Sequence, residues 1–151
     1  MSEVRIEIDI DAPPAAVWSV VMDPERFGEW VTIHRGLGAH SSGPPRVGSW
    51  MEQSMTLRGA HFKVKWELVV CEDAARAEWH GKGPARSHAE TEYLLSETAA
   101  GGTHFSYRNE FRAPMGPLGA AASRVLVGGL PEKEARATLN RLKKLVESAQ
   151  T

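Results

Sequence analysis

Apolar and polar residues alternate with a period of two through much of the first 112 residues, which predicts half-buried β-strands. The pattern is clearest where Phe62, Val64 and Trp66 alternate with lysines. Turn-forming residues separate most stretches at hairpin distance, so we expect an antiparallel sheet. Strands are predicted at Val4–Asp11, His34–His40, Val47–Arg58, Ala60–Glu72, Arg76–Lys82, His88–Glu97 and His104–Arg112.

Two short helices are expected between the first two strands. The segment Asp11-Ala-Pro-Pro14 ends the first strand, and its prolines suit the first turn of a helix over Ala15–Met22. Asp23-Pro24 then starts a second helix over Glu25–Glu29. This is too little helix for a doubly wound α/β fold.

The C-terminal part of the chain predicts a long helix with two different halves. Leu118–Leu130 is apolar or small almost all round and is expected to border a cavity. Gly128, Gly129 and Pro131 predict a break or bend at the junction, with the first half able to shift and admit a ligand. The second half is amphipathic, with a narrow stripe that should anchor on the sheet. The stripe consists of Ala135, Leu139, Leu142, Val146 and Ala149.

This order of elements predicts an α+β fold in which a long C-terminal helix lies on one face of an antiparallel sheet. The 151 residues fit a single domain that spans the chain. Charged residues recur at the outward strand positions, so the convex face of the sheet is expected to be solvated.

Composition narrows the classes of partner. Eighteen basic and nineteen acidic residues give a net charge of -1, which offers no general attraction to nucleic acid or an anionic membrane. The single cysteine, Cys71, excludes an internal disulfide or a cysteine-based zinc site, and the six histidines lack metal-ligand spacing. No signal peptide and no run of about 20 apolar residues is present. We therefore expect a cytoplasmic protein without metal, cofactor or membrane insertion.

The opening segment carries a family resemblance. Ala12-Pro13 ends a strand, Val17-Trp18 lies on a helix, and Asp23-Pro-Glu-Arg-Phe-Gly-Glu-Trp30 follows. This order resembles the START-related lipid-transfer, birch-pollen-allergen and polyketide cyclase/dehydratase (SRPBCC) superfamily. The resemblance implies a helix-grip fold: a curved seven-stranded antiparallel sheet wrapped round the C-terminal helix, with a cavity between them. The family has no catalytic motif.

The inward strand positions and the facing helix residues are the candidates for lining this cavity, although the aromatic ones could equally pack into a solid core. Gln53, Thr91, Tyr107 and Asn109 are polar members of the set, and each must bond to protein, water or ligand. If they share one space, a ligand with an oxygenated end is favoured. The candidates are Trp30, Met51, Gln53, Met55, Val64, Trp66, Trp79, Thr91, Tyr93, Phe105, Tyr107, Asn109, Leu118, Ala122 and Val125.

Three functions remain open. The first is a carrier or sensor that binds a hydrophobic or amphipathic small molecule. The second is a metal-free enzyme of the polyketide cyclase or dehydratase type, in which Tyr107, Asn109 or Gln53 would polarise a carbonyl or move a proton, although no catalytic residue is assigned. The third is a module that binds a protein partner through the basic end of the last helix, around Arg141 and Lys144. A homodimer is also left open.

Overall fold

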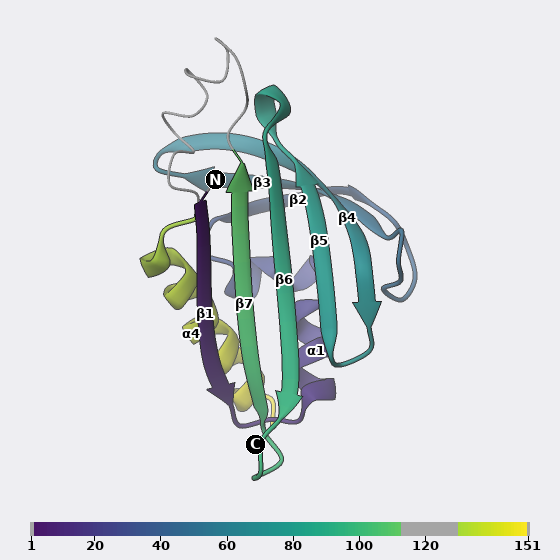
Figure 1. Ribbon diagram of the computed structural model, residues 1–151, viewed down its shortest axis with the longest axis vertical. Helices are drawn as coiled ribbons and strands as arrows, with labels where there is room; N and C mark the ends of the chain where they lie inside the picture. The colour runs from purple at the N-terminus through teal and green to yellow at the C-terminus, as the bar shows by residue number, and fades with distance from the viewer. Residues whose placement is uncertain (1, 113–129, 151) are drawn as a thin grey trace.

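The computed structural model describes residues 2–112 and 130–150. In these residues, one curved sheet carries its helices on a single face (Figure 1). The elements are β1 (Ser2–Ile10), α1 (Pro14–Val21), α2 (Phe27–Trp30), β2 (His34–His40), β3 (Trp50–Leu57), β4 (Ala60–Glu72), β5 (Arg76–Lys82), β6 (His88–Glu97), β7 (Thr103–Arg112) and α4 (Glu132–Ser148). A 3₁₀ turn over Pro24–Arg26 leads into α2.

The sheet has seven strands in the order β1-β7-β6-β5-β4-β3-β2, and every neighbouring pair is antiparallel. Strands β2 to β7 follow one another as a meander, while β1 joins the far edge by pairing with β7. The predicted α+β fold with a seven-stranded sheet is therefore confirmed.

Strand β3 begins later than the alternation predicts, at Trp50 rather than Val47. Gly48 has a positive φ of 97°, which belongs to a turn and not to a strand. Val47, just before it, is 64% exposed. The apolar residue at position 47 therefore extends the pattern without extending the strand.

Helix α4 begins just after Pro131, whose backbone is extended with ψ at 144°. Helix α4 does not extend back through this proline, as the predicted break or bend at the junction requires. The predicted first half, 118–129, lies outside the described residues. The stripe of α4 is buried as predicted except at Ala149, which is exposed because the helix ends at Ser148.

Both ends of α4 are hydrogen-bonded to the rest of the fold. At its first turns, the Thr32 hydroxyl donates to Glu134 Oε2 at 2.6 Å, and the Thr32 amide donates to Thr138 Oγ1 at 3.1 Å. Near its end, Lys143 Nζ donates to the Asp9 carbonyl at 2.8 Å and the Asp11 amide donates to a Glu147 carboxylate oxygen at 2.7 Å. The helix is thus held in place at both ends.

The convex face departs from the predicted solvated surface at its centre. Arg108 on β7 is ion-paired with Glu78 on β5, Glu92 on β6 and Glu110 beside it, at 3.2, 3.5 and 3.2 Å. The arginine side chain is only 11% exposed. The strand register places Glu78, Glu92 and Arg108 in one row across three strands, so these long side chains cover one another.

Candidate ligand-binding cavity

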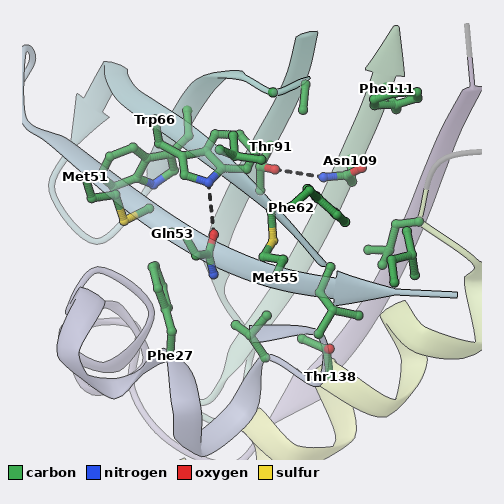
Figure 2. A pocket seen from close by; sticks show the side chains of 18 of the residues that line it. Phe27, Met51, Gln53, Met55, Phe62, Trp66, Thr91, Asn109, Phe111 and Thr138 are labelled. Carbon is green, nitrogen blue, oxygen red and sulfur yellow. Dashed lines mark hydrogen bonds between the residues drawn. The ribbon is translucent and has the colours of Figure 1, made fainter. Parts of the chain in front are cut away.

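A cavity of about 100 Å³ lies between the concave face of the sheet and the helices. Figure 2 shows Gln53 and Met55 of β3, Trp66 of β4 and Asn109 of β7 facing Phe27 of α2 across this space. An engineered apolar cavity of about 150 Å³ binds benzene, whereas pockets for drug-sized ligands hold about 300–1,000 Å³. In this conformation the cavity is therefore smaller than pockets that hold drug-sized ligands.

Most of the predicted lining residues do border this cavity. They are Trp30, Met51, Gln53, Met55, Val64, Trp66, Trp79, Thr91, Tyr93, Tyr107 and Asn109. Phe105 was predicted among them, but it is fully buried against Tyr93 in the packed core and is not part of the lining. Leu118, Ala122 and Val125 lie outside the described residues. Binding by any of these residues remains a prediction.

Several lining residues were missed in the sequence. Phe62 and Phe111 occupy inward positions by the same alternation that identified their neighbours. Phe27, Val31 and Ile33 come from α2 and the segment after it, where no strand parity applies. Thr138 lies three residues after Ala135 on the buried face of α4, so its helical spacing could have identified it.

A chain of side-chain hydrogen bonds runs through one wall of the cavity. The indole of Trp66 donates to Gln53 Oε1 at 2.9 Å, and Gln53 Nε2 lies 3.0 Å from His34 Nδ1 (Figure 2 draws the first bond). An indole N–H can only donate, so the oxygen of Gln53 must face Trp66 and its NH₂ must face His34. His34 Nδ1 therefore accepts, and its imidazole is neutral in this arrangement.

His34 is the first residue of β2 and is half-buried. Its ring packs edge-on against Phe27, with 5.9 Å between the ring centroids. Burial lowers the pKa of His34 from its ordinary value, because desolvation penalises the imidazolium form. The position and the hydrogen bond both favour the neutral ring.

A second polar group joins β6 and β7. Asn109 Nδ2 donates to Thr91 Oγ1 at 2.9 Å (Figure 2), and both residues interact with the phenol of Tyr107. Burial raises the pKa of Tyr107 well above its ordinary value, and hydrogen bonds from Asn109 and Thr91 offset only part of that rise. Burial likewise raises the pKa of Tyr93. Both phenols are therefore neutral near pH 7 and can donate a proton, but they do not act as phenolates.

The absence of a side chain at Gly81 on β5 leaves room for the Trp66 ring. A Cβ at position 81 would lie 2.7 Å from Trp66 Cε3 and 2.7 Å from Val64 Cγ1, which is closer than such atoms approach. The indole therefore lies directly over the backbone of the neighbouring strand. The missing side chain at position 81 positions the donor of the Trp66–Gln53–His34 chain.

Three side chains with metal-ligating atoms gather on the opposite, convex face. Ligand atoms of Glu78, His80 and Glu90 lie within 4.8 Å of one another. However, Arg108 Nη2 lies 3.2 Å from Glu78 and 3.7 Å from Glu90, so both carboxylates already face a guanidinium. This arrangement is explained as part of the outer ion-pair cluster.

Comparison with known proteins agrees with the fold. The sequence matches the family described as "Polyketide cyclase / dehydrase and lipid transport" over residues 1–147. The chain belongs to this family. The match covers the sheet, the residues of the cavity and most of α4, which confirms the resemblance seen in the opening segment.

Similar proteins include one relative and two solved structures. An uncharacterised protein of Mycobacterium tuberculosis is 27% identical over 132 residues, covering 85% of this chain and 90% of that protein. The Zhui aromatase/cyclase of a Streptomyces species superposes with a TM-score of 0.81 at 14% identity, covering 99% of this chain and 95% of that one. A Deinococcus radiodurans protein gives 0.72 at 18% identity, with 99% of both chains covered. These structural matches show the fold.

In the described residues, none of the helices has the length and apolar character needed to cross a membrane.

Proposed function

We propose that this protein binds a small, mainly apolar molecule with an oxygenated end, as a carrier or sensor. The observation that carries the proposal is the placement of Gln53, Thr91, Tyr107 and Asn109 around one mainly apolar cavity. Apolar walls supply affinity at about 25 cal/mol per Å² of buried surface, and a few fixed polar groups orient the ligand. Membership of a family described by cyclase, dehydrase and lipid-transport activities supports a ligand-binding role.

The polar groups of the cavity are held in place before any ligand arrives. Thr91 and Asn109 are bonded to each other, and both oxygen and nitrogen of the Gln53 amide have partners. Groups fixed in this way lose little freedom on binding, which favours affinity. They also make the orientation of a bound ligand specific.

Native mass spectrometry of protein purified from its host tests the proposal. We expect a copurified small molecule in the wild type and lower occupancy in Thr91→Val, which removes a hydroxyl from the wall at nearly constant volume. Thr56→Val is the matched control, because Thr56 lies on β3 and bonds to His61 on the exposed side. Wild-type protein that carries no small molecule and retains none from a host extract would contradict the proposal.

A second candidate is an enzyme of the cyclase or dehydratase type. The neutral, buried phenol of Tyr107 beside Asn109 favours it, because such a group can donate a proton to a developing oxyanion. The Zhui protein with the same fold is an aromatase/cyclase. A volume of about 100 Å³ is small for a polyketide chain, so this reaction would require the walls to move apart. Turnover of a polyketide-like substrate that is unchanged in Tyr107→Phe would exclude this role.

The third function, a protein-partner module, receives less support. Two of the basic residues of α4 are ion-paired within the helix: Arg136 with Glu132 at 2.9 Å, and Lys143 with Glu147 at 2.6 Å. These pairs reduce the positive charge that an acidic partner would meet. Charge reversal at Arg141 and Lys144 in a pull-down would test what remains.

A further inference from the structure

Two tryptophans of the cavity wall have indole N–H groups without an acceptor. Trp30 is 1% exposed and Trp79 is 3% exposed, and both line the cavity. Neither Nε1 has a hydrogen-bond partner among the described residues. Trp66, in the same wall, has its indole paired with Gln53. Buried donors are normally satisfied, so two unpaired donors around one cavity point to an acceptor supplied from outside the protein.

Two acceptors of the wall already receive other donors. Trp79 lies beside Thr91 in the sheet register, but the Thr91 oxygen receives the Asn109 amide. The Gln53 oxygen receives Trp66. Trp30 contacts the ring of Tyr93 edge-on, with 6.2 Å between centroids, which offers at most a weak N–H to ring interaction. The indole N–H groups of Trp30 and Trp79 therefore remain donors without a partner among the described residues.

The wall also carries almost no charge. Among the described lining residues there is no aspartate, glutamate, lysine or arginine, and the only ionisable group besides the two phenols is the exposed His88. Among the described lining residues, an anionic ligand would meet no lysine or arginine, and a cationic ligand would meet no carboxylate. Burying either ion without a partner is costly. The wall thus favours a neutral ligand that accepts hydrogen bonds.

We propose that the cavity selects uncharged carbonyl compounds, with the indole N–H of Trp79 donating to the carbonyl oxygen and that of Trp30 as a second donor. This inference rests on the proposed function, because it assumes that the cavity binds a small molecule. Both nitrogens are covered by neighbouring atoms. Because the Trp79 nitrogen is covered, a ligand carbonyl reaches it only after a neighbouring lining side chain moves aside.

Three ring-sized probes separate the parts of this proposal. Acetophenone carries a carbonyl; α-methylstyrene has nearly the same shape with CH₂ in place of the oxygen; benzoate is an anion of similar size. Each is titrated into protein labelled with ¹⁵N at the tryptophan indoles, and the indole signals are followed by NMR. Both neutral probes have an aromatic ring, so their difference isolates the effect of the carbonyl. Trp66, already bonded, and the partly exposed Trp50 serve as internal references.

We expect acetophenone to move the Trp79 indole proton downfield, α-methylstyrene to bind without this shift, and benzoate not to bind. Trp79→Phe should weaken acetophenone binding by about three- to tenfold, the value of one hydrogen bond, and change α-methylstyrene binding by less than about twofold. Trp18→Phe is the matched control, because Trp18 is buried but does not line this cavity. Single Trp→Phe variants at each of the five tryptophans assign the indole signals.

The outcomes distinguish this inference from the function on which it rests. Both neutral probes could bind and shift the Trp30 and Trp79 indole signals to the same extent. In that case the indoles are not ligand donors and the inference is overturned, while ligand binding stands. Binding of benzoate as tight as that of acetophenone overturns the selection for neutral ligands. If no probe binds, the inference falls together with the proposed binding of ring-sized molecules in this cavity.

Discussion

The two sides of the concave face are built differently. Where α4 packs beside β1, the contact uses aliphatic side chains such as Leu139 and Leu142, and polar groups at both ends of the helix are paired. Where β3 to β6 face α2, the wall contains tryptophans, methionines and an amide, and two indole donors lack partners. The first side is completed by the protein itself. The second has the shape and chemistry of a surface that a ligand completes.

This difference predicts the largest stability effect on the helix side. Leu142 is fully buried, so Leu142→Ala should lower the free energy of unfolding by about 2–5 kcal/mol through lost burial and a new cavity. Met55→Ala should cost less, because its side chain already borders a cavity, yet it should alter ligand affinity more. Urea denaturation and ligand titration of both variants check this. If both variants changed the free energy of unfolding equally and the ligand affinity equally, the two sides of the concave face would not differ in this way.

The cavity wall itself should break most easily at Gly81. In Gly81→Ala the new methyl group meets the Trp66 ring and Val64 at 2.7 Å, and overpacking of this kind costs about 1–3 kcal/mol. Displacement of Trp66 should also separate its indole from Gln53. Gly36→Ala is the matched control, because a Cβ there meets nothing within 4 Å. Denaturant unfolding gives the cost, and unchanged stability with an unchanged Trp66 indole signal would show that the wall yields freely.

One residue belongs to both sides. Thr138 accepts the Thr32 amide at 3.1 Å and also lines the cavity. Thr138→Val keeps the volume but leaves that amide unpaired, so we expect a loss of about 1–2 kcal/mol in the free energy of unfolding. The control is Thr56→Val on the outer side of β3. Slower amide exchange at Thr32 in the variant than in the wild type would contradict this account.

Most of the fold could be predicted because the strands carry strict alternation, and the turns between them use residues with plain turn chemistry. Phe62, Val64 and Trp66 point inward as their parity requires. The start of β3 could not be predicted, because the apolar Val47 matches the alternating pattern although the turn at Gly48 separates it from the strand. The alternation of apolar and polar residues likewise could not show that Arg108 is covered, because its burial depends on glutamates from neighbouring strands.

The candidate site was predictable only as a set of inward residues. Alternation places Phe105 inward as well as Tyr107, but it cannot distinguish a core position from a cavity wall, since both are buried. Which polar groups are paired also depends on register. Gln53 meets Trp66 and His34 only because β3 lies between β4 and β2. The unpaired state of Trp79 has no signal in the sequence.

The smallest expected effect concerns pH and the Trp66–Gln53–His34 chain. Burial lowers the pKa of His34 below its ordinary value of 6.5. The unfolded chain therefore binds this proton more readily than the folded protein, and His34 contributes stability that is present above the unfolded pKa and is lost as pH falls through the folded pKa. His104 has the opposite sign, because hydrogen bonding to Asp9 raises its pKa; that contribution is lost as pH rises, and solvent screening keeps it small.

Acidification from about pH 7.5 to about pH 5 should therefore lower the stability of the wild type more than that of His34→Gln, which lacks the titrating group. His40→Gln is the control, because His40 is exposed and bonds only to the Ser41 carbonyl among the described residues. A proton on His34 Nδ1 would face the Gln53 NH₂, so Gln53 must turn and release the Trp66 indole. The His34 ring and Trp66 indole signals should then titrate together in NMR spectra. A His34 midpoint at or above 6.5, with a Trp66 signal that does not follow it, would show that the histidine does not hold this wall of the cavity in place.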